Sequence, residues 1–414
     1  MKSVLVLAAT ASLGWQAVVC LAATVLQPSY HLREIFVPLT SDFTQRYTGA
    51  VTSAAPTSFD LSPDGKTLAV EFSTGTQQDI GRWIALWDLD RERLIGAKQV
   101  DTNIPYIAWY INNIRFSPDG RKLIVLTGPR LVALSVPDLK ILYAFEDRVQ
   151  LQDAPNQMFI EGFSIASNRL AILRQYDYNS GHSYSLEVQI ADLDSGIVLA
   201  RWGWPRLCYS IAMSPDAILL ALAIPPGRWG DRDISAKQSN VFIVKPDTGQ
   251  VVRDFNSGYA VGDAQFVGGN NVLVTVPLNS DFSPDDAIKV WDIKSARVEQ
   301  ELTYARYGLR GGISVSADSK LLAVAAFWLN AKDIERDRDN VRGGARLLLW
   351  TLHGGKLLYA SEQLPQEYNR AGLPMAVSYG RIAPPVLVRM SASGDRLAIG
   401  GMLISVDFIV KDQG

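Results

Sequence analysis

The sequence predicts an all-β fold, and a repeated phrase, the residue composition and the repeat length carry that prediction. Residues 59–70 read Phe-Asp-Leu-Ser-Pro-Asp-Gly-Lys-Thr-Leu-Ala-Val, which is typical of a strand, a tight turn and a second strand. The phrase returns at residues 114–126, with weaker copies at 211–223, 313–325 and 388–400. Ten Trp, fifteen Tyr and fourteen Phe, with short aliphatic runs, favour strands. Four-stranded units at a period of about 50 residues are typical of a β-propeller.

Each unit contains one strand before the Ser-Pro-Asp-Gly-like turn, a second strand after it, and two more strands joined by a second turn. The predicted units are residues 59–100, 114–145, 163–202, 211–255, 264–302, 313–361 and 387–410. The last unit has only three strand candidates, and residues 31–39 form one strand candidate ahead of the first unit. We therefore expect a single propeller, 56–410, with seven four-stranded blades, closed by the N-terminal strand that completes the last blade. Six or eight blades remain alternatives, because the third and fifth turns are degenerate.

Two units carry a Trp-Asp dipeptide at the end of the third strand, Trp87-Asp88 and Trp291-Asp292. Together with the turns, these dipeptides resemble the WD-repeat family and the related secreted bacterial propellers of the Tol and quinoprotein types, over roughly residues 56–410. The resemblance implies the propeller fold and leaves the function open. The Gly-His dipeptide of WD repeats is missing, so their buried Asp-His-Ser/Thr-Trp network is expected to be absent.

The N-terminus differs from the rest of the chain. Lys2 precedes an uncharged apolar run over residues 4–26, which is typical of a secretory signal peptide. We assign residues 1–23 to the signal, with an uncleaved N-terminal anchor as the alternative. Residues 24–55 form a lead segment that holds the closing strand, and 411–414 form a short tail. The expected location is extracytoplasmic, either secreted or periplasmic, and after cleavage Cys208 has no partner for an internal disulfide.

The composition and motifs exclude several classes of function. The formal net charge of −2 offers no basic surplus for nucleic-acid phosphates. The three histidines fall in separate parts of the repeat, so we expect no metal site. Gly162-Phe163-Ser164-Ile165-Ala166 lies on an expected innermost strand, without the elbow that a serine nucleophile needs. No Walker-type loop occurs, and we predict no catalytic residue and no cofactor.

Connections between the second and third strands are long in units four and six, at residues 225–239 and 327–345. In a propeller these connections emerge at the same end as those between successive units, where binding residues are often found. Trp, Tyr and Arg, the residue types enriched at binding hot spots, recur in both sets of connections. The candidate binding residues are Trp109, Trp204, Trp229, Arg232, Tyr307, Arg310, Trp328, Arg336 and Arg338.

These observations predict an exported, non-catalytic propeller that binds another protein or a small ligand through its long connections. Contact with a membrane is expected only if the N-terminal segment is uncleaved. The alternative is a propeller enzyme that acts on a sugar, lactone or quinone-type molecule near the centre of the ring. That alternative depends on analogy of fold, and the scarcity of histidine counts against it.

Overall fold

The computed structural model describes the chain in segments, and its regular elements are all β-strands. The described residues are 32–34, 54–76, 79–102, 114–127, 130–146, 156–178, 185–206, 208, 210–224, 239–259, 261–277, 287–303, 312–329, 343–360, 388–399 and 402–405. This part of the chain contains no helix with the length and apolar character that a membrane crossing requires.

Six blades each contain four antiparallel strands that follow one another along the chain. Blade 1 comprises β2 (Ala54–Leu61), β3 (Thr67–Thr76), β4 (Asp79–Asp88) and β5 (Arg93–Thr102). Blade 2 comprises β6 (Ile114–Phe116), β7 (Lys122–Leu126), β8 (Arg130–Ser135) and β9 (Ile141–Glu146). Blade 3 comprises β10 (Asn156–Ala166), β11 (Arg169–Tyr178), β12 (Ser185–Asp192) and β13 (Val198–Trp204).

The second half of the ring repeats this arrangement. Blade 4 comprises β14 (Ser210–Met213), β15 (Leu220–Ala223), β16 (Val241–Val244) and β17 (Val251–Phe255). Blade 5 comprises β18 (Val261–Val267), β19 (Val272–Pro277), β20 (Ile288–Asp292) and β21 (Arg297–Leu302). Blade 6 comprises β22 (Ile313–Val315), β23 (Leu321–Leu329), β24 (Gly343–Thr351) and β25 (Leu357–Ala360).

A seventh four-stranded sheet joins the two ends of the described chain. It contains β26 (Val388–Met390), β27 (Arg396–Ile399), β28 (Met402–Ser405) and β1 (Leu32–Glu34). Strand β1 pairs antiparallel with β28, and Arg33 lies opposite Leu403.

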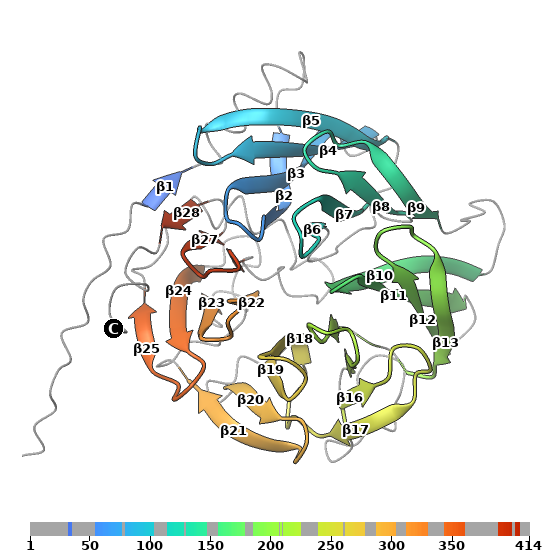
Figure 1. The fold of residues 1–414 in the computed structure, drawn as a ribbon, viewed down its shortest axis with the longest axis vertical. Helices are drawn as coiled ribbons and strands as arrows, with labels where there is room; N and C mark the ends of the chain where they lie inside the picture. The colour runs from blue at the N-terminus through green and yellow to red at the C-terminus, as the bar shows by residue number, and fades with distance from the viewer. Residues whose placement is uncertain are drawn as a thin grey trace, which may run out of the picture.

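The sheets surround a common centre, with strands such as β2, β6, β10 and β22 nearest to it and β5, β13 and β21 at the circumference (Figure 1). The predicted all-β propeller with four-stranded antiparallel blades is confirmed.

In five of the seven sheets the turn after the innermost strand is held by its own side chains, which explains the repeated phrase. Ser62 Oγ donates to Asp64 Oδ1 at 2.6 Å and accepts from the Thr67 amide at 2.8 Å. Gly65 has φ +70°, a conformation that glycine adopts without steric cost. The same Ser–Asp hydrogen bond occurs at Ser117–Asp119, Ser214–Asp216, Ser316–Asp318 and Ser391–Asp395.

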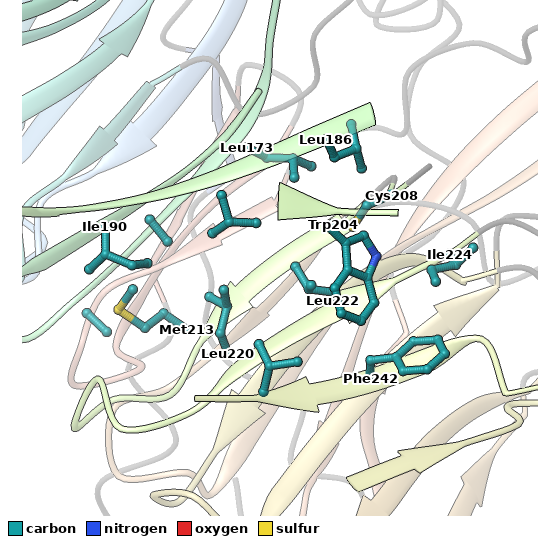
Figure 2. Close-up of a cluster of buried hydrophobic side chains, with 14 of the residues drawn as sticks. Leu173, Leu186, Ile190, Trp204, Cys208, Met213, Leu220, Leu222, Ile224 and Phe242 are labelled. Carbon is teal, nitrogen blue, oxygen red and sulfur yellow. The ribbon is translucent and has the colours of Figure 1, made fainter. Parts of the chain in front are cut away.

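Apolar side chains fill the spaces between neighbouring blades. Between blades 5 and 6, Val274, Ile288 and Val290 pack against Leu348 and Trp350 in one buried cluster. Figure 2 shows the equivalent cluster between blades 3 and 4. No disulfide occurs among the described residues, and this burial of apolar area between sheets is the main source of their stability.

Several strands are longer than the sequence predicts, and the extra residues form antiparallel hairpins. Strands β3 and β4 remain paired as far as Thr76 and Asp79, where a polar loop is predicted. Strand β10 begins at Asn156 rather than at 163, and β23 continues to Leu329. Apolar periodicity marks only the portion that packs between blades, whereas pairing with the neighbouring strand satisfies the backbone of the polar extension.

A side chain on the outer strand of one blade holds the turn between the third and fourth strands of the next blade. Trp202 Nε1 donates to the Pro246 carbonyl at 2.7 Å, and Tyr143 Oη donates to the Leu193 carbonyl at 2.6 Å. The Trp202 ring also covers Gly249, where an added Cβ would lie 2.6 Å from two ring carbons. These contacts join neighbouring blades at the circumference.

We expect Gly249→Ala to destabilise the protein more than Gly120→Ala, measured as the change in the denaturant midpoint. The two glycines have similar φ values, +69° and +72°, but a Cβ at Gly120 would meet only Pro63, at 3.6 Å. Gly120→Ala should therefore cost about 1–2 kcal/mol from backbone strain alone. Gly249→Ala should cost about 1–3 kcal/mol more because the added methyl meets Trp202. Equal effects of the two substitutions would contradict this account of the outer contact.

Candidate functional site

The centre of the ring is lined by one equivalent residue from each innermost strand, which we call the inner-ring position. In every sheet the residue that follows this position lies opposite a leucine of the second strand. The inner-ring residues are Asp60, Arg115, Ser164, Ala212, Gln265, Ser314 and Arg389. Three of the seven are charged, although the strands that carry them are otherwise largely buried.

Asp60 connects the seventh sheet, blade 1 and blade 2. Its Oδ1 lies 3.2 Å from Arg389 Nε and 3.9 Å from an Arg115 terminal nitrogen. Its Oδ2 accepts a hydrogen bond from the Phe116 amide at 2.7 Å. The Arg389 side chain is only 2% exposed and also donates to the Val388 carbonyl, so Asp60 is its buried counterion.

Asp263 is a fourth charged residue at the centre, on β18. Its Oδ1 accepts from the Ala264 amide at 2.8 Å, and the Ile313 amide is a second donor. Burial raises the pKa of Asp263 above its usual range, and the positive charges of Arg115 and Arg389 oppose that shift. The two arginines therefore lie within the electrostatic field of both carboxylates.

Burial and neighbouring charges also shift the pKa values of Asp60 and Arg389. Burial raises the pKa of Asp60, and Arg115, Arg389 and the Phe116 amide oppose the change. Burial, reinforced by the charge of Arg115, lowers the pKa of Arg389 to about 9. Asp60 and Arg389 are buried, whereas Arg115 and Asp263 are half-buried. Removal of Asp60 or Arg389 would therefore leave the other as a costly buried charge.

Neither a metal cluster nor a serine elbow occurs among the described residues. Within the residues that the structure describes, no three His, Cys, Asp or Glu side chains converge as a metal site would require. Ser164 Oγ, the hydroxyl oxygen in the elbow-like string, accepts a hydrogen bond from the Met213 amide at 2.9 Å, and Ser164 lies within strand β10 rather than on a strand-to-helix turn. It therefore forms part of the connection between blades 3 and 4.

The connections from the second to the third strand leave the blades at the end that we call the loop end. The opposite end, the turn end, carries the short Ser–Asp turns. Strand β3 with β4, β10 with β11, and β23 with β24 stay paired toward the loop end, beyond the strand ends that the sequence predicts. At the turn end, turns of neighbouring sheets are hydrogen-bonded to each other. For example, the Ala392 amide donates to the Pro63 carbonyl at 2.8 Å.

Only one predicted binding side chain is described, and its position corrects the prediction. Trp204 was expected in a connection between units, but it is the last residue of β13 and is 8% exposed. It contacts Phe242 edge-on, with ring centroids 5.3 Å apart, beside the buried thiol of Cys208, which donates to the Ser210 carbonyl (Figure 2). Its large apolar area is used in packing between blades 3 and 4, because the strand continues past the predicted end.

Trp328 also lies on a strand rather than in the predicted loop, since it pairs with Gly344 in the β23–β24 hairpin. The other candidates fall outside the described residues: Trp109, Trp229, Arg232, Tyr307, Arg310, Arg336 and Arg338. Their role in binding stays a prediction.

Sequence reasoning missed Asp60, Arg115, Asp263 and Arg389, although a signal for three of them exists. Each of these three stands between two apolar residues, two positions before the turn serine, as in Phe-Asp-Leu-Ser, Ile-Arg-Phe-Ser and Val-Arg-Met-Ser. A side chain at that position of an innermost strand reaches the next sheet, as Asp60 does with the Phe116 amide. Aligning the units on the turn serine would have revealed the group.

We expect Asp60→Asn to lower the free energy of unfolding by about 3–5 kcal/mol, because Arg389 would remain buried without its counterion. The matched control is Asp90→Asn, which removes the 2.7 Å partner of the more exposed Arg396. That exposed pair should contribute only about 0–1 kcal/mol. Denaturant unfolding of both variants checks the difference, and an equally mild effect of Asp60→Asn would contradict the assignment.

Comparison with known proteins supports the fold and leaves the function open. No family model matches the sequence, and no curated protein matches it. A chain of the mitotic checkpoint complex crystal structure superimposes with a TM-score of 0.53 at 13% identity, covering 98% of each chain. The C-terminal WD40 domain of Sif2 gives 0.48 at 12% identity, covering 86% of this chain and 83% of that one. Hydrazine synthase from Kuenenia stuttgartiensis gives 0.41 at 14% identity, covering 89% and 83%. At these identities the first match shows a common β-propeller fold, and the two weaker matches add nothing to it.

Proposed function

We propose that this protein is an exported, non-catalytic β-propeller of the WD-like type that binds another protein through its loop end. The observation that carries the proposal is the asymmetry between the two ends of the ring. At the turn end, short turns are hydrogen-bonded within and between blades. At the loop end, paired hairpins extend past the predicted strand ends, and long connections follow β15 and β23, an arrangement suited to presenting side chains on a rigid support.

The charged group at the centre supports a binding role over catalysis. Each carboxylate is already engaged by backbone amides, and Asp60 is also paired with Arg389. A group held in this way is positioned to maintain the ring rather than to exchange protons with a substrate. Export is supported by the uncharged apolar segment at residues 4–26, which follows Lys2.

The alternative, an enzyme acting on a sugar, lactone or quinone-type molecule near the centre, has one observation in its favour. Burial raises the pKa of both Asp60 and Asp263, and carboxylates of this kind serve as general acids in many active sites. Turnover of such a substrate that is lost in Asp263→Asn, with the fold retained, would favour the enzyme.

The proposal further includes a closed ring of seven blades, in which β1 supplies the outer strand of the last sheet. Closure of this kind joins the two ends of the chain and leaves no blade with an incomplete sheet. It would make the stability of the ring depend on a strand that lies far away in sequence.

The loop-end proposal is tested by site-specific photo-crosslinking in cells. A photoreactive phenylalanine analogue at Trp229 or Trp328 should crosslink to one defined protein, whereas the analogue at the exposed Arg121, at the turn end, should not. The double variant Arg336→Ala/Arg338→Ala should reduce the crosslink at least several-fold, because arginines contribute strongly at interfaces. Equal crosslinking from both ends would contradict the proposal. Export is checked in the same cells by fractionation, where a cytoplasmic chain would contradict that part.

Ring closure is tested by a disulfide between β1 and β28, in a background lacking Cys20 and Cys208. Residues directly opposite in antiparallel strands have Cβ atoms about 4.5–5.5 Å apart. Arg33→Cys with Leu403→Cys should therefore crosslink under mild oxidation. The control, Arg33→Cys with Ile404→Cys, places the thiols on opposite faces and should stay reduced. Similar crosslinking of both pairs would argue against the proposed closure.

A further inference from the structure

Along the circumference, a side chain of one outer strand covers a residue in the turn between the third and fourth strands of the next blade. Tyr143 covers Gly196 of blade 3, where an added Cβ would lie 2.6 Å from the tyrosine ring. Gln300 covers Gly355 of blade 6, where an added Cβ would collide with the glutamine amide group. Both covering residues end the row of directly opposite residues that begins at the inner-ring position of their blade. We call this row the rung.

The outer-strand residue of the rung also donates to the backbone of the turn that it covers. Tyr143 Oη donates to the Leu193 carbonyl at 2.6 Å. Arg253, at the same place in blade 4, donates to the Lys294 carbonyl of blade 5 at 2.9 Å. In blade 3 the contact is made by Trp202, two residues past the rung. A side chain at or beside this place therefore holds the next turn at successive junctions.

A cation on the second strand fixes the same turn. Lys122 of β7 pairs with Asp194 in the turn of blade 3, and Arg169 of β11 pairs with Asp247 in the turn of blade 4. Both cations lie two residues before the rung of their own blade, and both carboxylates lie four residues after the rung of theirs. These ion pairs mark how a turn is normally placed against the sheet before it.

The seventh sheet makes the equivalent ion pair with blade 1. Arg396 of β27 lies two residues before the rung residue Ala398, and its Nη2 is 2.7 Å from Asp90 Oδ1 in the turn of blade 1. Arg396 Nη1 also donates to the Gly65 carbonyl at 2.9 Å. The turn of blade 1 therefore lies against the seventh sheet as the turns of blades 3 and 4 lie against the sheets before them.

The outer-strand place in the rung of the seventh sheet belongs to Arg33. Along this rung Arg389 lies opposite Ala398, Ala398 opposite Leu403, and Leu403 opposite Arg33. Arg33 thus has in β1 the register position that Arg253 has in β17. By this equivalence, residue 33 is the one that meets the turn of blade 1.

Glu92 is the residue of that turn in the place of the covered glycines. It has φ +53° and lies six residues after the rung residue Leu86, just as Gly196 lies six residues after Ile190. Its side chain is exposed. An arginine and a glutamate at two facing places attract each other, so the register brings opposite charges together where the ends of the chain meet.

We propose that Arg33 and Glu92 form an ion pair that fastens the N-terminal strand to the turn of blade 1. The inference rests on the closed ring proposed above and adds the contact that holds the closing strand at the circumference. Other junctions place an aromatic ring or an amide over a glycine, whereas this junction uses opposite charges. Because salt screens an ion pair at an exposed site, the fastening of the ring responds to ionic strength.

A thiol–disulfide equilibrium measures how firmly β1 is held. In a background lacking Cys20 and Cys208, Glu34→Cys with Met402→Cys places two thiols at directly opposite residues of β1 and β28. The ratio of oxidised to reduced protein in a glutathione buffer then reports the pairing of the two strands. A firmly held strand gives a higher ratio at the same buffer composition.

Charge reversal in this background tests the pair. At low ionic strength Arg33→Glu should lower the ratio at least about threefold, because repulsion replaces attraction. Glu92→Arg should have a similar effect, and the two reversals together should restore the ratio. In about 1 M salt the single reversals should approach the unreversed protein, because exposed charges are screened. The matched control Glu299→Arg, an exposed charge on β21, should leave the ratio unchanged.

A chemical crosslink tests the contact directly. Arg33→Lys keeps the charge and supplies an amine, which a carbodiimide couples to an adjacent carboxylate with loss of water. We expect an amide bond between residue 33 and Glu92, located by mass spectrometry of the digested monomer. Adding Glu92→Gln should abolish this bond.

The proposal is overturned if the double reversal fails to recover the ratio lost in the single reversals. It is also overturned if the carbodiimide joins residue 33 to Asp90 or to another carboxylate in place of Glu92. Failure of the thiols at 34 and 402 to oxidise at all would overturn the closed ring itself, and the ion pair with it. The loop-end crosslink is independent of each of these results.

Discussion

The structure depends on how neighbouring sheets satisfy each other along the inner edges of their first strands. A propeller places several strand edges around one axis, where water is largely excluded and an unpaired amide is costly. Serine and aspartate oxygens at the inner-ring position meet this need at three junctions, and each bond also fixes the next blade in register. These hydrogen bonds thus align each blade with the next, which apolar packing cannot do because it is non-directional.

The same principle operates at the circumference with different side chains. Tyr143 and Trp202 donate to carbonyls in the turn of the following blade, while their rings cover Gly196 and Gly249. Each junction is therefore held at its inner and outer margins, with apolar packing between them. A ring built in this way has a defined angle between blades, and its loop end can vary without loss of the support beneath it.

The repeated part of the fold could be predicted because its determinants are local. Ser62, Asp64 and Gly65 form a turn through their own side chains and backbone, so the motif predicts the same turn wherever it recurs. The polar extension of β3 and β4 could not be predicted, because pairing such as Gly75 with Ile80 satisfies the backbone without any apolar pattern. The prediction for Trp204 was wrong for a related reason. A tryptophan near the end of a predicted strand looks the same in the sequence whether its side chain packs between blades or binds a partner.

The charged group at the centre could not be predicted from any single motif. Asp60 and Arg389 are separated by most of the sequence, and neither residue suggests a site alone. The ring brings these two residues together, because it gives every first strand an equivalent position beside the next sheet. The contacts at each junction therefore depend on residues from two neighbouring sheets. A serine or an aspartate there completes a junction, whereas an arginine requires a carboxylate from elsewhere. At Arg389 the neighbouring sheet supplies that carboxylate, since Asp60 lies 3.2 Å from its Nε, and the same carboxylate lies 3.9 Å from Arg115. One aspartate thus faces arginines from two other sheets, so the charge at each junction can be understood only together with its neighbours.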